Sequence, residues 1–560
     1  MVQKLIDFFN KEFSGLHQAA FLLGFSSLVS QLLGLFRDRL LAGHFGASSE
    51  LDIYYAAFRL PDLIFVSVGS FLAVTVLIPI LVDKIEHESV EDVKSFLSSL
   101  LTFFLLTITI TSAVVYIFTP YLVDFVAPGF DLQAKAKLIT MTRILLLSPF
   151  FLGLSNLFGA VTQSYKRFFI YALSPVLYNI GIISGVIFFY PVFGLDGLVY
   201  GVVLGALMHF LVQVPTVVSE GYFPAISFKF LKKDISKISS LSLPRTMALG
   251  VNVLAIMVLT ALASHMSSGS ISIFNFAFNL QSVPMALIGI SYSVAAFPTM
   301  SKMFSSGQKE EFVSYMSETL RHIIFWSMPI VTLFIVLRAQ IVRIILGSGN
   351  FNWDHTRLTA ALLAMFSLTV VFQSIIQLFD RAYYATGKTK QPVIIKIASS
   401  LIIIISAYLF INISSGHPGY ERLVDRVFRI ADVPGAEVLL LGLAFTIGTF
   451  INAIFLWITF EKDIKIRFSP RVMKTVLQSL LASIVLGIIT SFSLHIFNNF
   501  LDLQTFWGIF LHGLYSGLIG IFVWCMFLTA IKNEEMRGFT SMISRKFGNK
   551  RPIIPSPEGL

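Results

Sequence analysis

The strongest constraint on this chain is a series of long apolar runs that recur along almost its whole length. A helix needs about 20 mostly apolar residues to cross the hydrocarbon core of a bilayer. Fourteen runs meet this requirement, at residues 19–36, 53–82, 96–119, 137–164, 168–190, 194–218, 242–265, 271–300, 317–337, 357–385, 391–413, 438–460, 473–495 and 506–531. The runs lack the short alternating pattern of a membrane β-barrel. They therefore predict an all-α integral membrane protein with fourteen transmembrane helices.

The composition excludes the soluble alternatives. Hydrophobic residues make up 56% of the 560 residues, whereas charged residues make up only 13%. A soluble domain has about 25% charged residues, so a soluble enzyme, a disordered chain and a disulfide-rich secreted module are excluded. The one cysteine, Cys525, allows no internal disulfide. The net charge of +10 fits the basic loops of a membrane protein better than it fits nucleic-acid binding.

The distribution of Lys and Arg predicts the orientation of the chain. An even number of spans puts both termini on the same side of the membrane. Basic residues gather in the even-numbered loops, above all 219–241 and 461–474, and in the tail after residue 531. Because cytoplasmic loops carry such an excess, we expect both termini to be cytoplasmic.

A short motif suggests that the chain contains an internal repeat. The motif AFRL at 57–60 returns as AFNL at 277–280, and each copy is followed by a proline, Pro79 and Pro298. Both copies lie in the second helix of a six-helix block. Helices 1–6 and 7–12 are therefore predicted to form two lobes of parallel orientation around a central cavity, with helices 13 and 14 added.

The predicted spans and loops divide the chain into segments. These are an interfacial amphipathic helix at 1–18, an N-terminal lobe at 19–218, a cytoplasmic linker at 219–241, a C-terminal lobe at 242–460 with an insertion at 414–437, helices 13 and 14 at 461–531, and a basic cytoplasmic tail at 532–560. Within the insertion, residues 421–430 predict a short helix on the lipid headgroups or, alternatively, a substrate lid. Residues 538–560 of the tail are predicted to be disordered.

Ionisable residues inside the predicted spans are the best pointers to function, because a charge in the membrane is costly and usually faces a cavity. The densest group lies at the first hairpin and consists of Arg37, Asp38, Arg39, Asp52 and Arg59. The spacing of Asp52 and Arg59 places both on one face of a helix. The group predicts a cavity wall with arginines, whose planar donors suit phosphate. The alternative is that Arg37 and Arg39 anchor a helix end at the membrane interface and that Asp52 caps the second helix, to which it belongs.

Other charges lie in later spans. Arg143 is deep in the fourth span and is a further cavity candidate, with anchoring as the alternative. For Arg245 and Arg381 we expect anchoring at the membrane interface. The sequence contains neither the His-Glu-x-x-His motif nor a Cys pair, so we expect a transporter rather than an enzyme.

Three motifs together resemble the MurJ (MviN) family: SQLLGLFRD at 30–38, AFRLPD at 57–62 and RAYYATGKTKQP at 381–392. The resemblance covers most of the chain and agrees with fourteen spans. It implies membership of the superfamily of multidrug, oligosaccharidyl-lipid and polysaccharide exporters. It further implies a flippase of the bacterial cytoplasmic membrane that moves lipid II, the undecaprenyl-pyrophosphate-linked peptidoglycan precursor, from the inner to the outer leaflet by alternating access. A cationic cavity for the headgroup and a groove at helices 13 and 14 for the polyprenyl tail are also implied.

The sequence departs from the family pattern at several cavity positions. Gln31 and Phe65 stand where cavity arginines are expected, and Asn279 and Ser282 stand where the family usually has Arg and Glu. The resemblance and the embedded charges together give these substrate-binding candidates: Arg37, Asp52, Arg59, Gln31, Asp38, Asn279, Ser282 and Arg143. We expect Arg37 and Arg59 to pair with the pyrophosphate, while Asp52 holds or releases these arginines as the lobes rock.

Several alternatives stay open at this point. The missing arginines would also suit a flippase for another polyprenyl-linked saccharide. A drug/cation antiporter of the same fold would need a membrane acid such as Asp52 or Asp380, and a scaffold for cell-envelope partners would need no transport. No cofactor is expected, although transport could couple to the membrane potential or to a monovalent ion. Membrane lipids and cell-wall synthesis proteins are the candidate partners besides the substrate.

Overall fold

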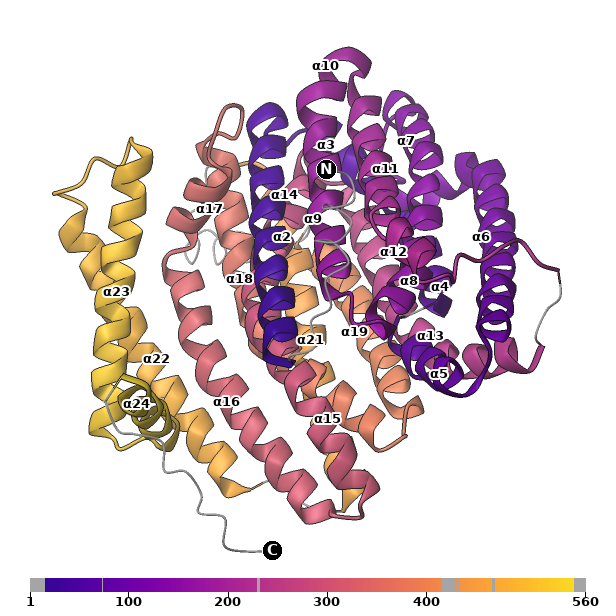
Figure 1. The fold of residues 1–560 in the computed structure, drawn as a ribbon. Helices are drawn as coiled ribbons and strands as arrows, with labels where there is room; N and C mark the ends of the chain where they lie inside the picture. Colours follow the sequence, from indigo (N-terminus) through magenta and orange to yellow (C-terminus); the bar gives the residue numbers. More distant parts are fainter. Residues whose placement is uncertain are drawn as a thin grey trace, which may run out of the picture. The chain divides into compact units, whose positions relative to one another are not determined.

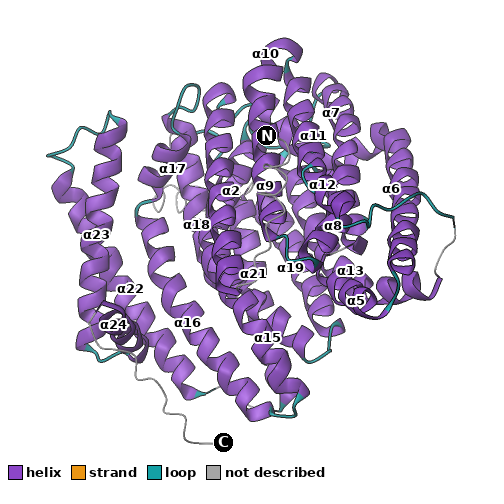
Figure 2. Ribbon diagram, viewed as in Figure 1, coloured by secondary structure: helices purple, strands orange, loops and turns teal. Residues whose placement is uncertain are grey.

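The computed structural model describes residues 16–72, 74–228, 232–414, 430, 433–465 and 469–547. Within these ranges the chain forms helices and connecting loops and contains no strand (Figures 1 and 2). The predicted all-α class is confirmed. The predicted helix at 1–18 falls almost wholly outside the described residues, as does most of the insertion at 414–437.

The first half of the chain begins with one long helix, α2, and contains several short ones. Its elements are α2 (Leu16–Phe45), α3 (Ser49–Ala57), α4 (Arg59–Ser67), the 3₁₀ helix η1 (Gly69–Leu72), α5 (Val74–His87), α6 (Val90–Val126), α7 (Leu132–Leu145), α8 (Leu147–Ser164), α9 (Phe168–Ser184), the π-helix η2 (Gly185–Phe189), α10 (Tyr190–Phe193), α11 (Leu195–Leu211) and α12 (Val214–Ser219).

The second half consists mainly of long helices. Its elements are α13 (Lys232–Ala263), α14 (Ser270–Met285), the π-helix η3 (Ala286–Ile290), α15 (Ser291–Ser305), α16 (Lys309–Val336), α17 (Arg338–Leu346), α18 (Trp353–Ala385), α19 (Lys390–Ser414), α21 (Val438–Ile464), α22 (Pro470–Phe497), α23 (Phe506–Ala530) and α24 (Glu534–Phe547).

Among the described residues, 12 helical stretches are long and apolar enough to cross a membrane. Each of them matches one of the predicted spans. The two other predicted spans, 19–36 and 53–82, correspond to α2 and to the series α3, α4, η1 and α5. The count of fourteen transmembrane helices therefore stays a prediction.

The second predicted span, 53–82, is interrupted rather than continuous. Ser48 caps α3 by accepting a hydrogen bond from Leu51 N at 3.4 Å. Pro61 lies in the first turn of α4, where a missing N–H costs little, and Pro79 lies inside α5. The resulting division makes Arg59 the first residue of α4, which positions it for the site described below.

The chain forms two compact units. Unit 1 comprises Met1–Val283, Ile345–Phe366 and Lys388–Phe455, whereas unit 2 comprises Pro284–Ile344, Ser367–Gly387 and Leu456–Leu560. These boundaries differ from those of the two predicted lobes, 19–218 and 242–460. The division into lobes stays a prediction.

Unit 1 has a core in which aromatic side chains of α6 and α8 meet. Phe96 and Phe104 of α6 pack in one buried cluster with Leu157 and Phe158 of α8. Ile238 of α13 is buried in the same cluster. Its burial explains why the predicted linker 219–241 is shorter than expected: from Lys232 on, the chain is already part of α13.

Glycines bring α9, η2 and α11 of unit 1 close together. A Cβ atom on Gly181 would lie 2.2 Å from the Cα atom of Gly205, and one on Gly201 would lie 2.4 Å from the Cα atom of Gly185. Both distances are far below a van der Waals contact. Small residues at such interfaces let the backbones of membrane helices approach each other.

Unit 2 contains a second buried cluster, formed by α16, α22, α23 and α24. Phe325, Leu486, Trp524 and Met536 contribute one buried side chain from each of these helices. The expectation of disorder in the tail is therefore wrong for residues 538–547, which continue α24. The tail folds here because Met536 is buried and because Asn533 caps the helix by accepting a hydrogen bond from Met536 N at 2.9 Å.

Candidate binding site

A cavity of about 250 Å³ lies in unit 1 among α2, α3, α4, α9 and α14. We call it the arginine cavity. Its polar lining consists of Arg37, Tyr54, Tyr55, Arg59, Asp62, Tyr178, Asn275 and Asn279. The lining combines two cations with one carboxylate, two amides and three phenols, so the cavity suits an anionic ligand that also accepts hydrogen bonds.

Arg37 of α2 is held by one carboxylate and one amide. Its Nε and Nη2 atoms donate to the same oxygen, Oδ1 of Asp38, at 2.9 and 2.8 Å. Its Nη1 atom donates to Asn179 Oδ1 of α9 at 3.4 Å. The Arg37 side chain keeps 22% of its surface exposed, whereas that of Asp38 keeps 3%. The guanidinium is therefore fixed in direction but still reachable from the cavity.

Asp38 links α2 to α14. While its Oδ1 atom accepts from Arg37, its Oδ2 atom accepts a hydrogen bond from Asn279 Nδ2 at 3.0 Å. Asn179 ties α9 to α2 in a similar way, because its Nδ2 atom donates to Ser30 Oγ at 3.1 Å. The polar side chains of three helices thus converge on one arginine.

Arg59 of α4 faces the same cavity with fewer partners. Its Nη2 atom donates to Asn275 Oδ1 at 2.9 Å. The residue is only 9% exposed, yet its Nε atom has no hydrogen-bond partner among the described residues. The buried hydroxyl of Tyr55, on α3, also lacks a partner there. A buried donor without an acceptor costs about 1–3 kcal/mol, so these groups mark a place for a ligand.

Asp52 has a different role from the one predicted. Its carboxylate accepts hydrogen bonds from Gly269 N and Ser272 N, both at 2.7 Å, and from Ser272 Oγ at 2.6 Å. It therefore caps the N-terminus of α14, where a negative charge is favourable. The prediction that Asp52 holds the cavity arginines is wrong, because Asp38 occupies that position beside Arg37. The alternative that Asp52 caps its own helix is also wrong, because Ser48 does so.

Further hydrogen bonds within unit 1 join the same end of α2 to the segment before α18. Arg39 Nη1 donates to Ile345 O at 3.3 Å, and Asn350 Nδ2 donates to His44 O at 2.5 Å. Together with the Asp52 cap, they connect segments that belong to the two different predicted lobes. The first hairpin is thus fastened at the end where α2 ends and α14 begins.

The remaining predicted site residues lie outside the lining of the arginine cavity. Arg143 donates through Nε to Tyr116 O at 3.2 Å and lies over the Tyr116 ring at 4.5 Å. Ser282 donates to Asn279 O in its own helix at 2.7 Å. Gln31 is half-buried and lines no part of the cavity. The cavity brings together Arg37, Arg59 and Asn279, with Asp38 behind them.

Sequence reasoning missed several residues of the site. Asn179 and Asn275 hold the two arginines, and Tyr54 and Tyr178 line the cavity. A signal existed for Asn275, which lies one helical turn before Asn279 and so shares its face. The amide of Asn179, in an otherwise apolar run, was a second signal of the same kind.

Comparison with known proteins places the chain in a family. The family described as lipid II flippase MurJ matches residues 41–511. The chain belongs to this family. The lipid II flippase MurJ of Burkholderia cenocepacia is 27% identical over 403 residues, which cover 70% of this chain and 78% of that protein. The probable lipid II flippase MurJ of Buchnera aphidicola subsp. Acyrthosiphon pisum is 29% identical over 376 residues, covering 65% and 72% of the two chains.

Solved structures share the fold. A lipid II flippase MurJ in an inward closed conformation superposes with a TM-score of 0.71 at 24% identity, covering 94% of this chain and 99% of that chain. An inward-facing multidrug resistance transporter of the MATE family, from the MOP superfamily, gives a TM-score of 0.62 at 15% identity, covering 80% and 96%. The predicted family is confirmed, and the chain is a multi-pass membrane transporter rather than an enzyme.

Proposed function

We propose that this chain moves lipid II from the inner to the outer leaflet of the bacterial cytoplasmic membrane, and that the arginine cavity binds the pyrophosphate of its headgroup. The observation that carries the proposal is the buried Arg59, whose Nε donor has no partner among the described residues and lies at the wall of a cavity that Arg37 also lines. The family supplies the substrate, since its relatives are named lipid II flippases.

Pyrophosphate matches the donors of the cavity. A guanidinium offers planar, paired donors that fit phosphate oxygens, and such charged hydrogen bonds are about twice as strong as neutral ones. Arg59 Nε and the Tyr55 hydroxyl need acceptors, which phosphate oxygens provide. A cationic drug would instead meet two arginines at the wall, which argues against the antiporter alternative.

Substrate binding would compete with the contact between Arg37 and Asp38. Phosphate oxygens approaching Arg37 draw its donors away from Asp38 Oδ1, and the Asp38 carboxylate also holds Asn279 of α14. A shift of Asp38 therefore loosens the link between α2 and α14. In the alternating-access cycle that we propose, the Asp52 cap keeps the cavity closed on one side of the membrane. The loosening between α2 and α14 then allows the cavity to open on that side.

Native mass spectrometry of the purified protein tests the proposal. Wild type is mixed with equimolar lipid II, undecaprenyl pyrophosphate and a different polyprenyl-linked glycan. We expect preferential retention of lipid II, and Arg59→Ala should reduce the retention of both pyrophosphate lipids by about 30-fold, as expected for a desolvated charge contact of about 2 kcal/mol. Arg143→Ala is the matched control, because Arg143 lies outside the cavity lining and should leave retention unchanged.

A flippase for another polyprenyl-linked saccharide is the second candidate. It is favoured by the amides Asn275 and Asn279, which line the cavity without adding charge. Preferential retention of the other glycan in the same mixture would support this candidate and contradict the first. Equal weak retention of all three lipids, unaffected by Arg59→Ala, would contradict both.

The orientation belongs to the same proposal. With both termini cytoplasmic, α23 ends and α22 begins on the cytoplasmic side. A cysteine placed at Lys532, with Cys525 changed to Ala, should react with a membrane-impermeant maleimide only after the cells are opened. Labelling of intact cells would overturn this orientation. The sequence offers no carboxylate in the seventh span for a sodium site, so we propose the membrane potential as the driving force.

A further inference from the structure

The arginine cavity has one carboxylate among its lining residues, that of Asp62. Asp62 lies in the first turn of α4, three residues after Arg59. Residues at this spacing are neighbours on one face of a helix, so the cation and the acid of α4 border the same space. In the sequence, Asp62 stands out only as the last residue of the motif AFRLPD at 57–62.

The carboxylate of Asp62 differs from that of Asp38, which lies behind Arg37. Both oxygens of Asp38 are occupied, Oδ1 by Arg37 and Oδ2 by Asn279, and its side chain is only 3% exposed. Asp62 is half-buried, and none of the described residues donates a hydrogen bond to its carboxylate or forms an ion pair with it. An ionised carboxylate can only accept hydrogen bonds. The oxygens of Asp62 are therefore available to donors of a ligand in the cavity.

The charges around Asp62 balance each other. Arg59 turns its Nη2 atom to Asn275 Oδ1 at 2.9 Å, and Arg37 is held by Asp38. The titratable residues that line the cavity with Asp62 are Arg37, Tyr54, Tyr55, Arg59 and Tyr178. The neighbouring helices α8 and α14 contain no titratable residue. When Asp38 is included, two arginines face two acids, so the empty cavity has no excess of positive charge.

This balance limits which ligand can bind. A pyrophosphate that contacts Arg59 can place its next group beside Asp62, because the two side chains are neighbours on α4. If that group is a terminal phosphate, the carboxylate repels it, and such repulsion is strong away from bulk water. If it is a sugar, its hydroxyl and amide groups donate to the carboxylate, and hydrogen bonds to a charged acceptor are about twice as strong as neutral ones. The cavity thus suits a pyrophosphate that has a sugar bonded to it.

We propose that Asp62 is a specificity residue, which accepts hydrogen bonds from the neutral sugar next to the pyrophosphate and repels a lipid that ends in a bare phosphate. The inference rests on the proposed function, in which the pyrophosphate lies at Arg59. In lipid II the second phosphate is bonded to a sugar, whereas in undecaprenyl pyrophosphate it is terminal. Asp62 therefore lets a cavity with two arginines discriminate between lipids that share the same polyprenyl chain and the same pyrophosphate.

Two other roles of Asp62 lead to different measurable results. If Asp62 only competes with phosphate for Arg59, its removal strengthens the binding of both lipids equally. If its carboxylate carries a proton and is neutral, replacing it by the neutral Asn, which has a similar shape, changes the binding of neither lipid. Only the proposed role predicts opposite changes for the two lipids.

The test uses Asp62→Asn in the full-length protein, which keeps the shape of the side chain and removes its charge. Native mass spectrometry at neutral pH measures the retention of lipid II and of undecaprenyl pyrophosphate. We expect retention of undecaprenyl pyrophosphate to rise about tenfold, because a like-charge contact is lost. Retention of lipid II should fall about threefold, because the amide oxygen is a weaker acceptor than a carboxylate. Glu50→Gln is the matched control and should change neither, since Glu50 is exposed on α3 and does not line the cavity.

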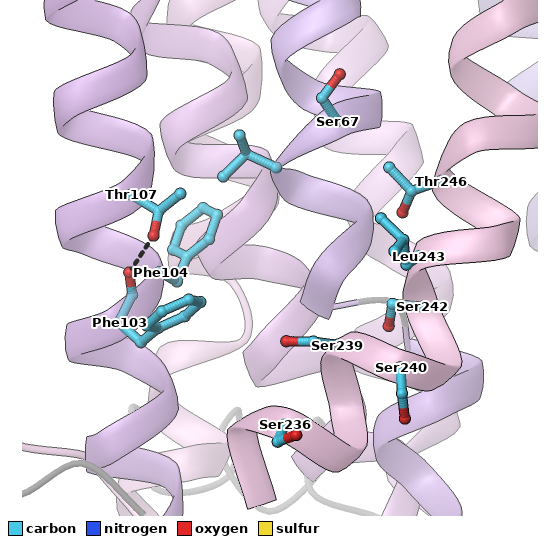
Figure 3. A pocket seen from close by; sticks show the side chains of 11 residues that line it. Ser67, Phe103, Phe104, Thr107, Ser236, Ser239, Ser240, Ser242, Leu243 and Thr246 are labelled. Carbon is cyan, nitrogen blue, oxygen red and sulfur yellow. Dashed lines mark hydrogen bonds between the residues drawn. The ribbon is translucent and has the colours of Figure 1, made fainter. Parts of the chain in front are cut away.

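A second control separates Asp62 from the rest of α4. Ser67, the last residue of α4, lines a different cavity of about 460 Å³ among α4, α6 and α13 (Figure 3). Asp62 does not line that cavity. Ser67→Ala should therefore leave the retention of both lipids unchanged. The same opposite changes in Ser67→Ala as in Asp62→Asn would show a general effect of altering α4 and would overturn the proposal.

A further variant, Asp62→Ala, guards against misfolding of Asp62→Asn. It also removes the charge, so retention of undecaprenyl pyrophosphate should again rise about tenfold. It lacks any acceptor, so retention of lipid II should fall about tenfold. Equal gains for both lipids, or unchanged retention in both variants, would overturn the proposal. If wild type prefers neither lipid and Arg59→Ala has no effect, the proposed function itself fails.

Discussion

Arg37 in unit 1 and Arg321 in unit 2 are both largely buried arginines on long helices, but their surroundings differ. Arg37 shares a single carboxylate oxygen of Asp38 and borders a cavity. Arg321 donates through Nε to Glu535 Oε1 at 2.7 Å and through Nη2 to Glu534 Oε2 at 3.0 Å. Arg37 is therefore paired with one acid, whereas Arg321 is paired with two acids of α24.

The acids that hold Arg321 have further partners of their own. Glu535, whose side chain is 2% exposed, also accepts from Thr475 Oγ1 at 2.7 Å, and Glu534 pairs with Lys474 at 3.2 Å. We call this group of five residues the α24 clamp. The comparison teaches that the number of acids paired with a buried arginine separates the two roles. An arginine paired with one acid can still bind a ligand, whereas an arginine paired with two acids serves the structure. Sequence position alone does not distinguish the two.

The largest expected effect is on transport. Arg37→Ala should reduce lipid II flipping by about 100-fold, as expected for loss of a desolvated charge contact, without loss of folded protein. Arg321→Ala should leave flipping within about threefold of wild type, because Arg321 lies in the clamp and not in the cavity. The measurement is lipid II exposure on the outer leaflet. Equal losses in the two variants would break the distinction between them.

The same substitution in the clamp should have a large structural effect. Arg321→Ala leaves Glu535 buried without its cation, which costs about 3 kcal/mol. Hydrogen exchange of the α24 amides should then speed up by about 100-fold, since each 1.4 kcal/mol is a factor of ten. Lys474→Ala is the control: its pair is exposed, so we expect a change within about fivefold. Unchanged exchange in Arg321→Ala would show that α24 is held by Met536 and its apolar neighbours alone.

Removing the charge of Asp38, the acid beside Arg37, should strengthen ligand binding, whereas removing Arg37 should weaken it. Asp38→Asn keeps the shape of the side chain but removes the charge that competes with phosphate for Arg37. We expect undecaprenyl pyrophosphate to bind about tenfold more tightly, while flipping becomes slower because release is impaired. Binding titrations and flipping measurements on one preparation check both parts. Weaker binding would mean that Asp38 mainly orients Arg37.

Acidification should have the smallest effect and should act on the clamp. The hydrogen bond from Lys474 lowers the pKa of Glu534. Burial by itself would raise the pKa of Glu535, but the hydrogen bonds from Thr475 and Arg321 outweigh it and the net pKa is lowered. A carboxylate with a lowered pKa stabilises the folded form above the ordinary pKa of Glu and loses this contribution as the pH falls through the lowered value.

The expected result is constant protection of α24 at neutral pH and a gradual loss of protection at pH values below the ordinary Glu range, about 4.3. Hydrogen exchange over a pH series, corrected for the intrinsic rate, measures it. Glu534→Gln should flatten this dependence. A loss of protection that begins near neutral pH would contradict the assignment to these two carboxylates.

Short-range sequence patterns predicted the helices, because a helix depends mainly on residues that are close together in the sequence. Long apolar runs gave helices because each such helix satisfies its own backbone in lipid. The division of the second span into α3, α4, η1 and α5 was not predicted. The pairing of Arg37 and Arg59 at one cavity followed from their positions in neighbouring helices.

Contacts between distant segments could not be predicted in this way. Asp52 caps a helix that begins more than two hundred residues later, and its own sequence neighbours give no sign of this. The clamp likewise pairs Arg321 with acids at the far end of the chain. α24 also lies beyond residues 41–511, which match the family, so the resemblance gave no expectation for it.

The glycine contacts between α9 and α11 have a mechanical consequence for the cavity. Two residues of α9 belong to the site: Tyr178 lines the arginine cavity, and Asn179 accepts a hydrogen bond from Arg37. On α11, a Cβ atom added to Gly205 would lie 2.4 Å from the backbone oxygen of Tyr178. Backbone rests almost directly on backbone there, with no side chain between them that could be compressed. α9 therefore forms a rigid wall of the cavity. An arriving headgroup must therefore be accommodated by movement of the other helices that line the cavity. These include α2 and α14, which Asp38 ties together.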